Sequence, residues 1–87
     1  MSAGETVAWN LRRLRIERGV PQEVLAVDAG IDRTYVSRLE RNLENPTVAV
    51  LERLAQALNI EIVEFFAAIA PGTELPRPLK SGRKAKR

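Results

Sequence analysis

Two short segments of helical pattern, separated by very few residues, are the feature that most limits how this chain can fold. The first segment covers residues 22–29, and the second runs to about residue 41 after Asp32, a good N-cap residue. Only Gly30 and Ile31 remain as a connection, and a glycine permits the positive φ of a tight turn. Two helices joined so closely must cross steeply, as in a helix-turn-helix unit.

Apolar residues recur at helical spacing on both sides of this unit and predict three further helices. They are expected over residues 4–18, over residues 48–59, and from about residue 61 to the Pro-Gly pair that follows residue 70. No segment has the pattern of a strand. The expected fold is therefore all-α, a compact five-helix domain over residues 1–70. The residues expected on its core side are Val7, Leu11, Leu14, Val24, Leu25, Ala29, Val36, Leu39, Val48, Leu51, Leu54, Ala55 and Leu58.

The net charge of +3 belongs to the carboxyl-terminal end of the chain. Residues 71–87 hold six Lys and Arg against one Glu, whereas residues 1–70 hold eight Arg against ten acidic residues. Because the last 17 residues combine Pro, Gly and basic residues with few apolar anchors, we expect them to be a disordered basic tail.

Composition argues against catalysis and metal binding. The chain has no Cys and no His, which supply the commonest nucleophile, general base and transition-metal ligands. We therefore expect no enzyme, no catalytic residue, no metal and no cofactor. Glu61 and Glu64, three residues apart, are interpreted as an exposed acidic helix face.

Two further absences bear on location. No apolar run approaches the roughly 20 residues needed to span a bilayer, and the first ten residues lack the pattern of a signal peptide. The lack of Cys fits a reducing compartment. The expected location is the cytoplasm, without a membrane partner.

The run GVPQEVLAVDAGIDRTYVSRLERNLENPTVAVLERLAQALNI resembles the DNA-binding domain of the Cro/C1-type, or XRE-like, helix-turn-helix family. The resemblance covers about residues 5–69 and implies a lambda-repressor-like fold. Within the family, DRTYVSRLERN is most similar to the small controller proteins of restriction–modification systems. Pro21 departs from the pattern, since the family usually has a Ser, Thr or Asn cap there. The implied function is that of a bacterial or phage transcriptional regulator that binds double-stranded DNA sequence-specifically.

The resemblance also implies a set of DNA contacts, because family members place the third helix in the major groove. The implied base contacts are Arg33, Thr34, Ser37 and Arg38, and the implied phosphate contacts are Gln22, Tyr35, Arg41, Asn42 and Asn45. An Arg can pair with O6 and N7 of guanine. Alternatives remain open: the two arginines are merely solvated, Tyr35 packs half-buried against the second helix, and Asn42 only caps the third helix.

Similarity to family members further implies a salt bridge between Arg15 and Glu40, joining the first and third helices. Its expected role is structural: it orients the third helix without touching DNA. Loss of one partner should destabilise the fold more than loss of both.

A single helix-turn-helix reads only a few base pairs, so we expect a homodimer on a pseudo-palindromic operator. The last helix has more apolar surface than a small domain needs. The expected interface residues are Leu58, Ile60, Ile62, Phe65, Phe66 and Ile69. The alternative is that this surface is entirely part of the intramolecular core. Trp9 receives no role.

Two hypotheses from different classes follow. The first is the dimeric DNA-binding regulator, a controller protein or a repressor, with RNA polymerase as a candidate further partner. The second is a protein-interaction module on the same fold, either an antitoxin or a coactivator. The basic tail either contacts phosphates without specificity or only solubilises the chain.

Overall fold

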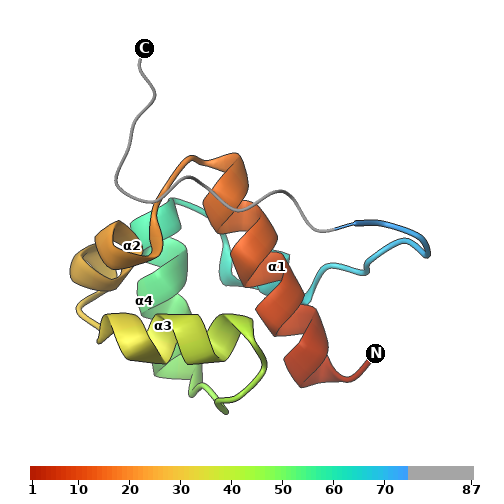
Figure 1. Cartoon of the computed structure of the whole chain (residues 1–87), viewed down its shortest axis with the longest axis horizontal. Helices are drawn as coiled ribbons and strands as arrows, with labels where there is room; N and C mark the ends of the chain where they lie inside the picture. The colour runs from red at the N-terminus through yellow and green to blue at the C-terminus, as the bar shows by residue number, and fades with distance from the viewer. Residues whose placement is uncertain (75–87) are drawn as a thin grey trace.

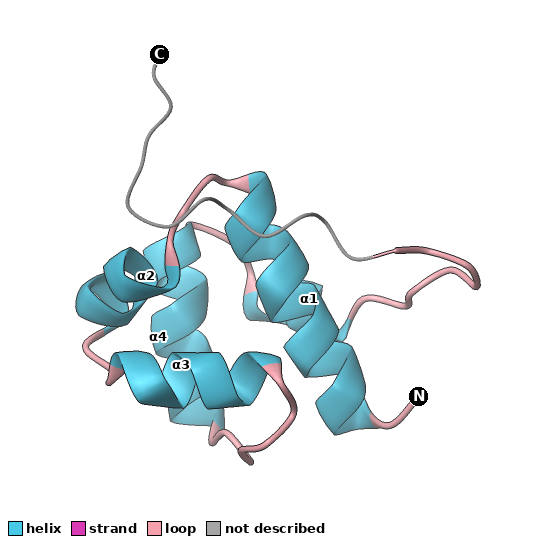
Figure 2. Cartoon of the chain, viewed as in Figure 1, coloured by secondary structure: helices cyan, strands magenta, loops and turns pink. Residues whose placement is uncertain are grey.

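The computed structural model describes residues 1–74, so most of the expected basic tail, residues 75–87, lies outside the described residues (Figure 1). The elements are α1 (Ala3–Glu17), α2 (Gln22–Ala29), α3 (Arg33–Glu40), α4 (Val48–Leu58) and the 3₁₀ helix η1 (Ile62–Phe66). Within residues 1–74 there is no strand (Figure 2). The all-α prediction is confirmed.

Local sequence explains where most helices begin and end. The side chains of Ser2, Asp32 and Thr47 accept hydrogen bonds from backbone N–H groups in the first turns of α1, α3 and α4. Helix α2 begins after Pro21, which makes no side-chain cap hydrogen bond. Gly30 ends α2 with φ of 68°, the left-handed conformation that the tight turn to α3 requires.

The helices pack around one small core. Helix α2 packs against both α3 and α4, while α1 packs against α3 and η1 (Figure 1). Each helix contributes one stripe, because its apolar residues recur at helical spacing. The buried apolar residues are Val7, Ala8, Leu11, Leu14, Leu25, Ala26, Ala29, Val36, Leu39, Leu51, Leu54, Ala55, Leu58 and Phe65.

Two residues expected in the core are exposed instead. Val24 on α2 and Val48 at the start of α4 lie on the surface. Helix α2 buries Leu25, Ala26 and Ala29, so Val24 faces solvent. The core stripe of α4 begins only at Leu51, one turn later.

The fifth helix is much shorter than expected. Only Ile62–Phe66 is helical, as a 3₁₀ turn, and the backbone becomes extended at Ala67 (φ −62°, ψ 139°). The buried amide of Asn10 on α1 explains this end, because it donates to the carbonyl oxygens of Phe65 and Ala67, both at 2.9 Å. In a longer α-helix the Phe65 carbonyl would accept from the backbone N–H four residues on. Here it accepts from Asn10, which ties the chain to α1 at the point where the helix ends.

Candidate nucleic-acid interface

Helix α3 has two faces of different chemistry. Val36, Leu39 and Glu40 are buried. The residues expected to contact bases lie on the other side: Arg33 and Thr34 are exposed, and Ser37 and Arg38 are partly exposed. The 3.6-residue period places all four on one continuous arc of the helix. The structure therefore brings the four predicted base-contacting side chains together on one open surface.

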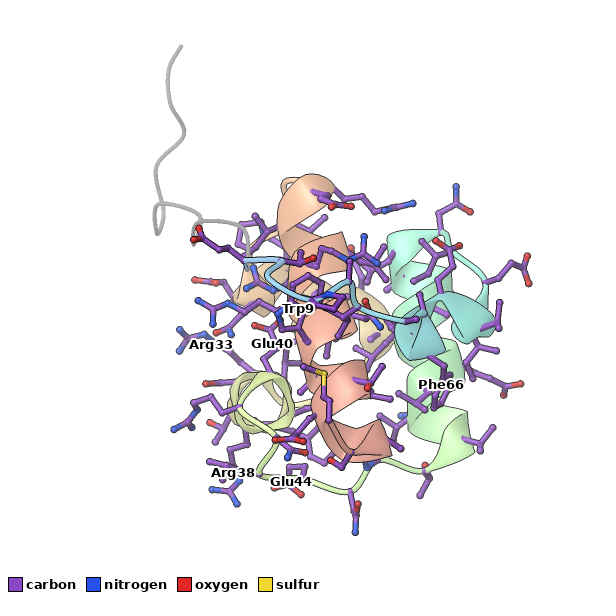
Figure 3. All side chains as sticks on the ribbon, turned by 90° about the vertical axis from the view of Figure 1, so that its right-hand side faces the viewer. Trp9, Arg33, Arg38, Glu40, Glu44 and Phe66 are labelled. Atoms are coloured by element: carbon purple, nitrogen blue, oxygen red, sulfur yellow. The ribbon has the colours of Figure 1, made fainter. Side chains whose placement is uncertain are left out.

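Arg33 stands in the first turn of α3, where its guanidinium is only weakly engaged. Its Nε lies 4.0 Å from Oε1 of Glu23 on α2, and the two side chains are 63% and 53% exposed. An ion pair so exposed contributes little and is readily exchanged. Figure 3 shows Arg33 extending away from the body of the domain.

Arg38 stands one turn later and is engaged by the loop that follows α3. Its Nε donates to Oε2 of Glu44 at 2.7 Å, and its Nη2 donates to the Leu43 carbonyl at 3.1 Å. Arg38 is 43% exposed and Glu44 is 29% exposed. Arg38 extends to the same side of the molecule as Arg33 (Figure 3). Sequence reasoning placed Arg38 on this surface but missed its partner.

The buried end of α3 is held by a hydrogen-bonded ion pair. Nε and Nη2 of Arg15 on α1 donate to the two carboxylate oxygens of Glu40, the second at 3.0 Å. The Arg15 and Glu40 side chains are only 6% and 3% exposed. Arg15 also donates to the Val20 carbonyl, and Gln22 donates to Oε1 of Glu40 at 3.0 Å. The expected salt bridge is therefore present, and Gln22 extends it to α2.

Gln22, expected at a phosphate, is half-buried and already gives one amide hydrogen to Glu40. Because a side-chain amide has two N–H groups, one donor is left beyond this bond. The backbone N–H groups of the first turn of α2 lie beside it and favour an anion. The phosphate contact stays a prediction.

The remaining predicted phosphate residues lie around the end of α3. Arg41 is exposed and its Nε donates to the Ser37 carbonyl at 3.3 Å. Asn42 is exposed and adopts φ of 59°, so it does terminate α3, as the alternative interpretation held. Asn45 is exposed in the loop. No described contact occupies the Asn45 side chain.

Tyr35 is half-buried against the core, as the alternative interpretation expected of its burial, and its phosphate contact stays a prediction. Burial raises the pKa of its phenol above the ordinary value of 10.0, and the negative charge of Glu44 raises it further. The hydroxyl is therefore a neutral hydrogen-bond donor at physiological pH.

The six residues expected at a dimer interface differ in exposure. Leu58 and Phe65 are wholly buried in the core of the single chain, so assigning them to the interface was wrong. Ile60 and Ile62 are partly buried against that core. Phe66 is 49% exposed and its neighbour Val63, which sequence reasoning did not select, is 66% exposed. Ile69 is half-buried and lies beyond η1.

Two residues without a predicted role are also explained. The guanidinium of Arg13 lies over the ring of Trp9, 5.8 Å from its centroid, and donates to the Asn10 side chain. Trp9 is half-buried, and Figure 3 places it on α1, away from Phe66. Asn10 could have been noticed in the sequence because it interrupts an apolar stripe.

Residues 1–74 contain no group of three or more potential metal ligands. None of the helices in this part of the chain is both long and apolar enough to cross a membrane.

Comparison with known proteins identifies the domain. A family model described as helix-turn-helix matches residues 11–65. An uncharacterised HTH-type transcriptional regulator of Sinorhizobium fredii is 41% identical over 76 residues, which are 87% of this chain and 95% of that protein. Other relatives are longer: the chain covers 51% of a hypothetical transcription factor of Neisseria meningitidis.

Solved structures agree with the narrower resemblance to controller proteins. The restriction-modification controller protein C.AhdI of Aeromonas hydrophila matches with a TM-score of 0.71 and 40% identity, over 72% of this chain and 96% of that chain. Controller protein C.Esp1396I, solved as a tetramer on its natural 35-base-pair operator, matches with a TM-score of 0.70 and 36% identity, over 76% and 87% of the two chains.

Variants of C.Esp1396I with three consecutive residues replaced one at a time, an arginine, a threonine and a tyrosine, match equally well. The same residue types follow one another here as Arg33, Thr34 and Tyr35. The extent of the family match, the all-α fold and the similarity over 87% of the chain lead to one conclusion: this chain belongs to the helix-turn-helix family of DNA-binding transcriptional regulators, with the Cro/C1-type fold.

Proposed function

We propose that the chain acts as a homodimer that reads a pseudo-palindromic operator in double-stranded DNA. The observation that carries the proposal is the outward arc of α3. Arg33, Thr34, Ser37 and Arg38 share this open surface, while the opposite face of the helix is fixed in the core. A helix presented in this way fits the major groove, with its amino-terminal residues toward the base edges.

Arg33 is the first candidate for direct readout. It stands in the first turn of α3 and is held only by a long, exposed contact to Glu23. Its guanidinium is therefore free to pair with guanine, and Thr34 beside it offers a hydroxyl and a methyl group. In C.Esp1396I an arginine, a threonine and a tyrosine in succession were each replaced for study, and the same three residue types follow one another in this segment.

Phosphate contacts would fix the register of the domain on the duplex. The candidates surround α3 on two sides: Gln22 with the first turn of α2 on one, and Arg41, Asn42 and Asn45 on the other. Tyr35 adds a neutral donor. Such contacts carry no sequence information, so they would raise affinity for any DNA.

A second copy of the chain would cover the exposed apolar pair Val63 and Phe66. Both lie on η1, with Ile60 and Ile62 partly buried next to them in the sequence. Figure 3 shows Phe66 on the side of the domain opposite Arg33 and Arg38, so pairing there leaves α3 open. Two copies related by a two-fold axis would read half-sites about 34 Å apart. The relative C.Esp1396I, as a tetramer on its operator, supports oligomeric binding.

A regulator of this kind would act in the cytoplasm by its position at a promoter, where it blocks or recruits RNA polymerase.

The test is selection of binding sites from a pool of random duplex DNA by the full-length protein at near-physiological salt. The proposal expects a two-fold symmetric motif with half-sites about one helical turn apart. A pool without an enriched motif would contradict it, and the open face of α3 would then point to a protein partner such as that of an antitoxin or coactivator.

Two variants separate base contacts from phosphate contacts on the selected duplex. Arg33→Ala should lower the preference for that duplex over random DNA about 10-fold, since it removes a base contact. Gln22→Ala should weaken binding to both duplexes about equally. Equal loss on both duplexes for Arg33→Ala would exclude Arg33 from readout.

The dimer is tested by sedimentation of Phe66→Glu, with Val27→Glu as the matched control. Val27 is an exposed apolar residue on α2, away from η1. Phe66→Glu should sediment as a folded monomer, because a charge would be buried in the interface, and Val27→Glu should stay dimeric. A wild-type monomer at micromolar concentration would rule out this interface.

A further inference from the structure

Glu44 is an acidic residue at the edge of the candidate interface, and it holds one of the arginines placed for base contacts. It lies in the loop between α3 and α4, six residues after Arg38. Its carboxylate accepts from Nε of Arg38, and the carbonyl of the adjacent Leu43 accepts from Nη2 of the same guanidinium. Figure 3 shows the Glu44 and Arg38 side chains together at one edge of α3.

The donors left free on Arg38 match what a guanine requires. A guanidinium has five N–H groups in one plane. The loop takes the Nε hydrogen and one on Nη2, so Nη1 keeps both of its hydrogens and Nη2 keeps one. Guanine presents two acceptors side by side, O6 and N7, in the major groove. Two donors on neighbouring nitrogens therefore remain for this pair of acceptors.

The loop also restricts the side chain before any DNA arrives. A free surface arginine samples many rotamers and loses this freedom when it binds, which weakens the complex. Arg38 is fixed at two points by the loop, and Glu44 is itself only 29% exposed. Its charge reaches Tyr35 on the same side of α3, where it contributes to the raised pKa of the phenol.

We propose that Glu44 is a positioning residue for DNA readout, which presets the Arg38 guanidinium so that its free Nη donors meet a guanine edge. This inference rests on the proposed function, since it needs base reading by α3. A carboxylate beside DNA repels the phosphates of every sequence equally. Its contribution is therefore to the preference for one sequence over others rather than to affinity as such.

The experiment measures the ratio of affinities for two duplexes of equal length: the one selected by the wild-type protein from random DNA, and a random one. The variants are Glu44→Ala, which removes the acceptor, and Glu44→Gln, whose amide oxygen can still accept from Nε. Glu52→Ala is the matched control, because Glu52 is exposed on α4 and makes no ion pair with another described residue. Thermal melting checks that each variant is folded.

Glu44→Ala should lower the preference ratio about 10-fold, Glu44→Gln by less, and Glu52→Ala not at all. In an Arg38→Ala background, Glu44→Ala should cause no further loss, because the residue acts only through the arginine.

Three outcomes would overturn the proposal while leaving the proposed function intact. The first is that Glu44→Ala leaves the preference ratio and both affinities unchanged. The second is that Glu44→Ala raises the affinity for both duplexes while the preference ratio stays constant. The third is that Glu44→Ala lowers the preference ratio further in the Arg38→Ala background. The second would show that Glu44 only repels phosphates. A pool without any enriched motif would overturn the proposed function and this inference together.

Discussion

Helix α3 is joined to the rest of the domain by two Arg–Glu pairs that differ in their surroundings. Arg15 and Glu40 are almost wholly buried, with side chains 6% and 3% exposed, whereas Arg38 and Glu44 are 43% and 29% exposed. Both pairs have an Nε donating to a carboxylate oxygen. The buried pair is further satisfied by Val20 and Gln22, so no charge is left uncompensated in the core.

The difference separates a structural role from a binding role. A buried pair cannot exchange its partners without unfolding, so it can only fix the orientation of α3 relative to α1 and α2. An exposed pair contributes little to stability and keeps donors that another molecule can reach. The same two residue types therefore support the helix on one side and prepare it for a ligand on the other.

Breaking the buried pair should have the largest effect on stability. Arg15→Ala or Glu40→Ala leaves one buried charge without its partner and should lower the free energy of unfolding by about 3–5 kcal/mol. For the double-mutant cycle, Arg15→Met and Glu40→Met should each cost a similar amount, and their combination should cost less than either single change. Urea unfolding measures all three, and a double variant that loses the sum of the single effects would show that the two residues are not coupled.

Removing the amide that extends the buried pair should have an intermediate effect. Gln22→Ala deletes one hydrogen bond to the Glu40 carboxylate and should lower the free energy of unfolding by about 1.5 kcal/mol. In a Glu40→Met background the same change should be nearly neutral. If Gln22→Ala left the free energy of unfolding unchanged with Glu40 intact, the hydrogen bond between Gln22 and Glu40 would not contribute to stability. Any loss of DNA affinity in Gln22→Ala would then come only from the lost phosphate contact.

Breaking the exposed pair should change stability least among the three. Arg38→Ala and Glu44→Ala should each alter the free energy of unfolding by less than about 1 kcal/mol, and 1 M salt should remove most of that difference. The cost of Arg15→Ala should persist in salt, because the buried pair is hardly screened. If Glu44→Ala lowered the free energy of unfolding by more than about 2 kcal/mol even in 1 M salt, the Arg38–Glu44 pair would have a structural role like that of Arg15–Glu40.

The smallest effect is a shift in one titration. Tyr35 is the only tyrosine, so ultraviolet absorbance at alkaline pH follows its phenol directly. The pKa should lie above 10.0, first because of burial and second because of Glu44. Glu44→Gln should lower this pKa toward the ordinary value without reaching it, whereas Glu52→Gln should leave it unchanged.

The sign of the linked stability change follows from that shift. The folded state favours the neutral phenol, so this contribution to stability is present below the unfolded-state pKa and is lost as pH rises through the folded-state pKa. Titration of Tyr35 at or below 10.0 would contradict the burial seen for this residue.

Most of the fold could be predicted because the signals are local. Asp32 and Thr47 cap helices by bonding to their own neighbours, and Gly30 makes its turn through its own backbone. Val36 and Leu39 form the apolar stripe of α3 and indicate its buried face, so the remaining residues of the helix could be assigned to its outer face. The candidate base contacts were placed on that face for the same reason, while their roles came from resemblance to the family.

The errors all concern contacts between distant segments. Val24 looked like a core residue, yet the packing of α2 between α3 and α4 leaves it outside. Phe65 and Phe66 are neighbours of one type, and only packing against α1 and α4 decides that the first is buried and the second exposed.

The sequence by itself determined the positions of the four α-helices, the N-caps of α3 and α4, and the polar face of α3, because periodicity and capping act over a few residues. Only the tertiary structure shows where the last helix stops. At that point the Asn10 amide donates hydrogen bonds to two carbonyl oxygens of a segment more than 50 residues away in the sequence. The tertiary structure also decided the orientation of Arg38, because a rotamer is selected by whichever acceptor the folded chain brings near. Here that acceptor is Glu44, which helical spacing alone does not place beside α3.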